Sequence, residues 1–178
     1  MKKKTRNILL SVLTGALLLC AIAGGTVYYY LFAPQFHPSK TVYVYVDRDD
    51  TADSIYNKIR QTGHVNKFTG FQWMAKYRKF DQKIHTGRYA IRPNENAYHV
   101  FSRFFRGYQE PMNLTIGSVR TLDRLARSIG KQLMIDSAEI ASQLFDSTFQ
   151  AQMGYTSITL PSLFIPETYQ VYWDMSVD

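Results

Sequence analysis

The hydrophobic pattern of this chain begins with one long apolar stretch and then changes to short periodic segments. Residues 8–32 carry no charged side chain, whereas residues 1–7 contain four basic ones, Lys2, Lys3, Lys4 and Arg6. A stretch of about 25 apolar residues is long enough to cross a hydrocarbon core of roughly 30 Å as a helix. The sequence therefore predicts a transmembrane helix over residues 8–32, preceded by a basic cytoplasmic flank.

A cleaved signal peptide is the alternative to this anchor. Its apolar region would span only about 7–15 residues and end at a small-x-small site. Here the run continues through Tyr28, Tyr29 and Tyr30, which resemble the aromatic belt of a membrane interface. Because cytoplasmic flanks carry the Lys and Arg excess, we expect a single-pass protein of the cytoplasmic (inner) membrane, with its N-terminus inside and its C-terminal part extracytoplasmic.

Beyond a predicted linker at residues 33–40, the pattern changes to period two and then to helical spacing. TVYVYV at residues 41–46 alternates as a half-buried strand should. A helix follows, with Asp50 or Thr51 as its cap and Gly63 as the left-handed residue that ends it. We predict that the first module opens with strand, turn and helix.

The first module continues with two more helices and a second strand. The first of these helices is expected at about residues 68–80, with an apolar stripe of Phe71, Met74 and Tyr77. RYAI at residues 88–91 predicts a strand that pairs with the first one. Asn96 can cap the last helix and Gly107 can stop it, giving a module over residues 41–107.

Several aromatic residues of this module have two interpretations. They are Trp73, Phe101, Phe104 and Phe105. A stripe at helical spacing is typical of a core, which is the interpretation that we favour. The alternative is a platform for the apolar faces of sugar rings.

Residues 108–178 repeat the change from strand to capped helix. MNLTI at residues 112–116 predicts a strand, and Thr121 can cap a helix with a buried stripe. Asp136 and Glu139 have the spacing of a capping box for another helix. A stretch that is neither periodic nor charged then leads to LFIPETYQVYW at residues 163–173.

Charge changes sign between the two modules. The net charge of the chain is +7, and Cys20 is its single cysteine. Residues 33–106 hold 13 basic and 6 acidic side chains, whereas residues 107–178 hold 4 and 8. A basic module outside the membrane is able to face anionic lipid or anionic wall polymer, and its compartment argues against nucleic acid. A solvated basic face is the structural alternative.

The segment at residues 163–173 holds the candidate chemistry. Glu167 lies beside Pro166 and close to Phe164 and Tyr169, so that aromatic surroundings are able to raise the pKa of a proton donor. The alternative is a carboxylate that caps a turn after Pro166. His37, His64, His85 and His99 share no ligand spacing, so we predict no metal, and no cofactor motif is present.

The order of these parts resembles a known family. The pieces that carry the resemblance are GRYAI, ENAYHVFSRFFRG, VRTLDRLARSIGKQL and LFIPETYQVYW. This chain resembles the membrane-anchored endolytic murein transglycosylases, the MltG or YceG-like family. The resemblance implies an α+β fold with one transmembrane helix, a LysM-like module at residues 41–107 and the start of the catalytic domain at residues 108–178.

The resemblance also implies a reaction and a set of partners. Such enzymes are lytic transglycosylases that cleave the MurNAc–GlcNAc linkage and leave 1,6-anhydro-MurNAc ends, which terminates nascent glycan strands. The partners implied are peptidoglycan, the inner membrane and cell-wall synthases, with no nucleic acid and no cofactor. Phe164, Pro166, Glu167 and Tyr169 match a substrate-binding signature in the cleft.

The catalytic residue of the family is expected beyond residue 178. Family members carry their catalytic glutamate in a segment of the form ASIxExET, which does not occur in these 178 residues. We therefore expect this chain to be an incomplete, inactive version whose second module leaves a sheet edge unpaired. A non-catalytic peptidoglycan-binding or scaffold protein is the alternative.

Overall fold

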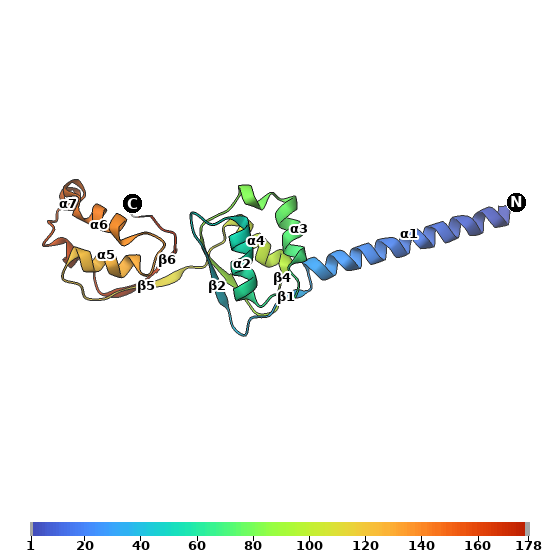
Figure 1. Cartoon of the computed structure of the whole chain (residues 1–178), viewed down its shortest axis with the longest axis horizontal. Helices are drawn as coiled ribbons and strands as arrows, with labels where there is room; N and C mark the ends of the chain where they lie inside the picture. The colour runs from blue at the N-terminus through green and yellow to red at the C-terminus, as the bar shows by residue number, and fades with distance from the viewer. Residues whose placement is uncertain (1, 177–178) are drawn as a thin grey trace.

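The computed structural model describes residues 2–176 and places a long helix and two small modules in a row (Figure 1). The first helix, α1 (Lys2–Leu31), projects from the first module, and the second module lies at the opposite end of the molecule. Each module combines helices with a short antiparallel sheet. The expected α+β class is confirmed.

Helix α1 has the length and composition of a membrane span. Its stretch Leu10–Leu31 contains 22 residues, none of them packed inside the protein. At 1.5 Å per residue this stretch is about 33 Å long, close to the thickness of a hydrocarbon core. The helix is therefore compatible with a single-pass anchor.

The first module contains three helices and two small sheets. Its elements are β1 (Pro34–Phe36), β2 (Val42–Val46), α2 (Ala52–Gly63), α3 (Thr69–Tyr77), the 3-10 helix η1 (Phe80–Gln82), β3 (Gly87–Ile91), β4 (Glu95–Asn96) and α4 (Ala97–Arg106). Strands β2 and β3 are antiparallel, with Val44 opposite Tyr89, as the sequence predicts. Strands β1 and β4 form a second antiparallel pair.

An aromatic core fills this module. Phe71 is fully buried, and its ring contacts those of Phe68, Phe80, Phe101 and Phe104. Burial of these rings confirms the core interpretation for Phe101 and Phe104.

Two aromatic residues of α3 contradict the expected buried stripe. Trp73 is 49% exposed and Tyr77 is 85% exposed, whereas Ala75 is buried. A stripe at positions 68, 71 and 75 takes the inner face, because a three-residue step followed by a four-residue step keeps to the 3.6-residue helical repeat more closely than a run of three-residue steps. Phe105, the fourth residue of the predicted core set, packs only partly buried against the core.

Residues 33–40 are not a loose linker. Strand β1 begins three residues after α1 ends, and Phe36 is fully buried in the core. Phe36 also forms an isolated bridge with Val65, and its carbonyl accepts a hydrogen bond from the Asn94 backbone. Helix α1 therefore leads into the first module without a flexible linker.

Two helix ends differ from the sequence prediction. The left-handed residue after α2 is His64, with φ of 45°, while Gly63 remains helical and lies against Phe36 and Ile91. Gly63 is therefore required for close packing and not for its backbone freedom. Asp136 caps its helix as predicted by accepting from the Ala138 amide, but Glu139 completes no capping box.

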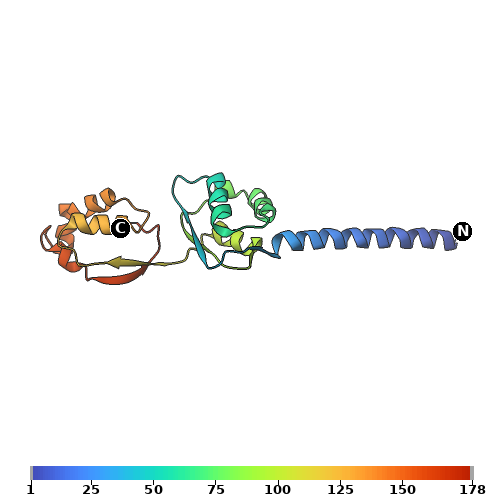
Figure 2. The same cartoon turned by 60° about the horizontal axis from the view of Figure 1, so that its bottom comes forward.

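The second module contains a two-stranded sheet with helices on one side (Figure 2). Its elements are β5 (Met112–Ile116), α5 (Leu122–Gly130), α6 (Ser137–Phe145), α7 (Ser147–Met153), the 3-10 helix η2 (Leu160–Leu163) and β6 (Glu167–Val171). Strand β6 pairs antiparallel with β5, with Leu114 opposite Tyr169. The ETYQV part of the candidate segment thus pairs one edge of β5, and among the described residues the outer edge of each strand has no partner strand, as the sequence predicts for this module.

Candidate functional site

The predicted site residues lie at the start of β6, and the structure brings two of them into one cavity. Phe164 and Tyr169 line an apolar cavity of about 530 Å³ under the β5–β6 sheet. The Tyr169 hydroxyl donates to the carbonyl of Ile165 at 3.2 Å, which holds the ring at the cavity edge. Pro166 and Glu167 are exposed and lie outside the lining.

Glu167 occupies the rim of this cavity. It is opposite Ile116 in the sheet, and residues directly opposite each other share a face. Ile116 lines the cavity, so Glu167 lies on the cavity side of the sheet at the end of the strand. Within residues 2–176 its carboxylate makes no hydrogen bond or ion pair, which excludes the turn-capping alternative for this side chain in this structure.

The cavity itself is almost wholly apolar. Its lining residues include Leu114, Ile129, Leu133, Ile140, Leu144, Phe149 and Val171, and its polar members are Gln143, Tyr169 and Ser176. No carboxylate, histidine or cationic side chain is among the lining residues. General acid–base chemistry needs an ionisable group within hydrogen-bond reach of the reacting atoms. Among the described residues the lining offers no carboxylic acid for this role, and Tyr169 is its only ionisable side chain.

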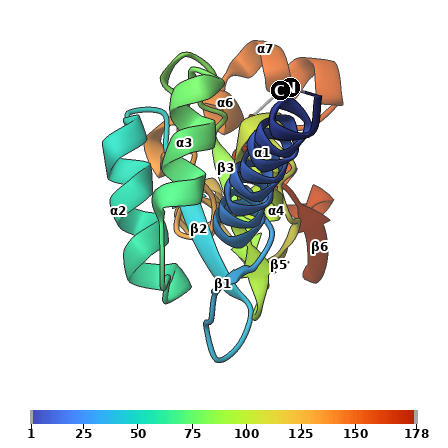
Figure 3. The same ribbon diagram turned by 90° about the vertical axis from the view of Figure 1, so that its right-hand side faces the viewer.

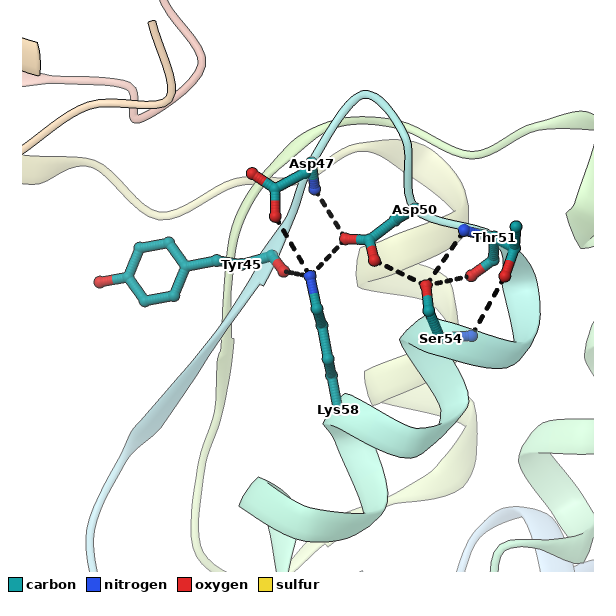
Figure 4. Close-up of polar contacts among 6 residues, drawn as sticks. All are labelled: Tyr45, Asp47, Asp50, Thr51, Ser54 and Lys58. Atoms are coloured by element: carbon teal, nitrogen blue, oxygen red, sulfur yellow. Dashed lines mark hydrogen bonds and ion pairs between the residues drawn. The ribbon is translucent and has the colours of Figure 1, made fainter. Parts of the chain in front are cut away.

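A polar cluster in the first module brings three charged side chains together at the end of β2 (Figure 4). The Lys58 ammonium group donates to Asp50, to Asp47 at 3.2 Å and to the carbonyl of Tyr45 at 3.0 Å. The Ser54 hydroxyl also donates to Asp50, at 2.6 Å. These bonds join the end of β2 to the first turns of α2.

Hydrogen bonds determine the charge state of this cluster. Burial would raise the pKa of Asp50, but donation from Lys58, Ser54 and the Asp47 amide outweighs it and holds this pKa below its usual value. For Lys58, burial alone would lower the pKa, and the bonds to Asp50 and Asp47 raise it instead. Both groups are thus fixed in their charged forms. The cluster stabilises a turn and provides no group poised to exchange a proton near neutral pH.

A third arrangement of side chains joins the two modules. The two carboxylate oxygens of Asp174 accept from Thr86 and from Gln109, each at 2.8 Å. The Trp173 ring contacts Tyr45 at 5.0 Å between centroids, and its carbonyl accepts from the Met134 amide at 2.9 Å. The segment after β6 therefore bridges β2 and the loop before β3 to the second module.

Asp174 also influences a buried tyrosine. Burial, with a further contribution from the Asp174 charge, raises the pKa of Tyr89 well above its usual value. The Tyr89 hydroxyl donates to the carbonyls of His85 and Thr86, so that it stays neutral and fixes the loop that Asp174 contacts.

Sequence reasoning missed this junction. Trp173 and Asp174 follow the last periodic segment, and no local pattern indicates a partner about 90 residues away for Asp174. The composition of the segment is only a weak indication of a contact site: a Trp ring next to a carboxylate suits a surface that offers both an aromatic ring and a hydrogen-bond donor. Among residues 2–176, no group of three or more His, Cys, Asp or Glu side chains could hold a metal ion.

Comparison with known proteins relates this chain to one protein family. A model of the YceG-like family matches residues 44–178. A crystal structure of a YceG-like protein from Listeria monocytogenes is similar at 21% identity and a TM-score of 0.38, over 75% of this chain and 49% of that chain. This chain thus spans about half the length of that protein. No match was found among curated proteins.

Proposed function

This chain belongs to the YceG-like family, and we propose that it is the anchor-bearing part of an envelope enzyme that cleaves peptidoglycan glycan strands. The observation that carries the proposal is the family match over residues 44–178, immediately after a helix that is long and apolar enough to cross a membrane. The basic residues at the N-terminal end of α1, before its apolar stretch, support an N-terminus inside and both modules outside.

The proposed reaction is a lytic transglycosylation. The bond between C1 of MurNAc and O4 of GlcNAc breaks while the 6-hydroxyl of MurNAc attacks C1. An acid gives its proton to the departing O4, and the resulting base takes the proton of the 6-hydroxyl. Because the substrate supplies the nucleophile, one carboxyl group is able to perform both transfers, whereas a glycoside hydrolase normally needs two.

In this proposal the described residues position substrate and a later segment supplies the acid. Phe164, Pro166, Glu167 and Tyr169 are proposed to line the approach to the glycan, with Glu167 at the cavity rim. The apolar cavity offers no acid, which supports a catalytic glutamate outside these 178 residues, in a segment of the form ASIxExET. Cell-wall synthases are proposed as partners on the same grounds of family membership.

The first experiment asks whether this chain alone cleaves glycan. The full chain in nanodiscs is incubated with uncross-linked glycan strands, and the products are examined by mass spectrometry for 1,6-anhydro ends. We expect none. Formation of such ends by the chain, and their loss in Glu167→Gln, would show that the acid lies within these residues and would contradict the proposed division of labour.

The second experiment separates the enzyme from a non-catalytic wall-binding protein, the alternative that a cavity lining without a carboxylic acid also allows. The chain is extended with a family segment that contains ASIxExET. Anhydro ends that disappear when the glutamate of that segment becomes glutamine support the enzyme. A folded extension that binds glycan in a pull-down but yields no such ends supports the wall-binding protein.

A further inference from the structure

The end of the membrane helix is fixed to the first module by direct contacts. Gln35, which is 2% exposed, donates from its side chain to the carbonyl of Tyr29 at 2.9 Å. The backbone of Tyr30 lies over Gly70, where any Cβ would collide with the Tyr30 carbonyl oxygen. The depth of the first module relative to a membrane is therefore set by α1 itself.

Helix α3 runs across the direction of α1 at this end of the module (Figures 1 and 3). If α1 crosses the membrane, α3 lies approximately along the membrane surface. Gly70, Trp73 and Tyr77 share one side of α3, since they are three and four residues apart. Trp73 contacts the ring of Tyr30 at 5.2 Å between centroids, so this is the side that faces the end of α1.

Exposed aromatic side chains therefore gather at the level where α1 leaves the membrane. Besides Trp73 and Tyr77, Tyr98 on α4 is 40% exposed and contacts Phe32 at 5.5 Å between ring centroids. Trp and Tyr are enriched at membrane interfaces because their apolar rings and polar edges suit the headgroup level. Burial in the module does not explain Trp73 or Tyr77, whereas an interface does.

A groove of about 250 Å³ lies between α1, α3 and α4 on this face. Leu31 and Phe32 from the end of α1 line it, together with Met74 and Phe105, and Arg78 and Arg106 are its two charged members. The Arg78 guanidinium lies 4.7 Å from the ring centre of Phe105, and Lys83 lies 5.6 Å from the same ring. Within the described residues, Arg78, Lys83 and Arg106 form no ion pair.

We propose that this groove binds the headgroup of an anionic phospholipid in the leaflet that α1 reaches at Leu31. Arginine fits a phosphate with paired hydrogen bonds and a membrane surface attracts basic residues near its anionic lipids. The apolar lining accepts the glycerol and first methylene groups, and the volume, below the roughly 300 Å³ of common ligand pockets, suits a headgroup and not a whole lipid. This inference rests on the proposed anchor.

Lipid selection tests the site. The full chain is placed in nanodiscs of equal phosphatidylglycerol and phosphatidylcholine, and the lipids retained by the protein are counted by native mass spectrometry. We expect roughly a tenfold preference for phosphatidylglycerol, because two cations favour its net negative headgroup over that of phosphatidylcholine, whose choline cation neutralises the phosphate. The double variant Arg78→Gln, Arg106→Gln should lose this preference, while the matched double variant Arg124→Gln, Arg127→Gln on exposed positions of α5 should keep it.

Two results of this experiment would overturn the proposal. They are equal retention of the two lipids by the unaltered chain, and an unchanged preference in the Arg78 and Arg106 variant. Equal retention of the lipids together with binding of inorganic phosphate that this variant loses would assign the groove to free phosphate and not to a lipid. Circular dichroism of each variant confirms that it is folded.

Fluorescence quenching tests the placement independently. The chain has two tryptophans, so Trp173→Phe leaves Trp73 as the reporter and Trp73→Phe leaves Trp173. In vesicles that contain lipids brominated near the headgroup, we expect quenching of Trp73 and little quenching of Trp173. An unquenched Trp73 in chains that float with the vesicles contradicts the groove while the anchor stands, whereas chains that do not float contradict the anchor.

Discussion

The two modules differ in how completely they are closed. In the first, Phe71 and its neighbouring rings fill the centre, and Lys58 and Arg103 form ion pairs with three carboxylates. In the second, the described residues form no ion pair among themselves and the core opens into a cavity of about 530 Å³. A protein with a closed core in the module next to α1 and an open core in the other is expected to have uneven local stability.

Truncating a core aromatic residue is the strongest way to expose this difference. Phe71→Ala leaves a large cavity in a closed core and should cost about 4 kcal/mol of the free energy of unfolding. Phe149→Ala enlarges a space that is already open and should cost about 1 kcal/mol or less. Urea unfolding of the full chain in detergent measures both, and equal losses would mean that the second core is as closed as the first.

Breaking the best-buried ion pair should have the next largest effect. The Glu95 carboxylate accepts both guanidinium nitrogens of Arg103 at 2.9 and 2.6 Å, and both side chains are about 15% exposed. Glu95→Gln leaves Arg103 without its counter-charge and should cost about 2 kcal/mol, less than for a fully buried pair. Glu139→Gln, an exposed carboxylate on α6, is the control with no expected loss. Similar unfolding midpoints for both variants would contradict the role of this pair.

Acid should destabilise the first module before the second. Burial would raise the pKa values of Glu95 and Asp50, but bonds from Arg103 and Lys58 hold both below their usual range. Their stabilisation is therefore present above pH of about 4 and is lost as the pH falls through the lowered folded-state values. Near-ultraviolet circular dichroism of the tyrosine residues measures this unfolding. We expect the unfolding of the Glu95→Gln variant to depend less on pH than that of the unaltered chain. An unchanged pH profile in that variant would exclude Glu95 as the source.

The smallest expected effect is at the junction between the modules. Asp174→Asn keeps the shape of the side chain but removes its charge and replaces one of the two oxygens that accept from Thr86 and Gln109. The free energy of unfolding should therefore fall by about 1 kcal/mol. The two modules should also become less fixed relative to each other, with a larger radius of gyration in X-ray scattering. Scattering curves identical to those of the unaltered chain would show that other contacts hold the junction.

Much of the fold follows from local patterns. The strand pair β2–β3 and the caps Thr51, Asn96 and Thr121 were predictable because alternation, a capping oxygen and the following apolar stripe are all local. The exposed Trp73 was not, because its partner Tyr30 belongs to a helix that the pattern assigns to the membrane. Strand β1 was missed because Pro34 and Pro38 indicate a linker, while Phe36 is buried only by its contacts with distant elements.

The candidate site was less predictable than the fold. Phe164 and Tyr169 share a cavity as expected for neighbours of one cleft, but its apolar character depends on side chains from α5, α6 and α7 that lie far away in sequence. Whether Phe164, Pro166, Glu167 and Tyr169 contact glycan stays a prediction, as does the assignment of the first module as LysM-like. Asp174 joins the modules through tertiary contacts that no local signal indicates.

Hydrogen–deuterium exchange of the full chain tests the contrast between the two modules most directly. The paired amides of β2 and β3 lie over a closed core, and those of β5 and β6 lie over an open cavity. We predict that peptides covering residues 42–46 and 87–91 exchange much more slowly than those covering 112–116 and 167–171. Equal protection of both sheets would contradict the account, because it would mean that the second module is already a finished fold.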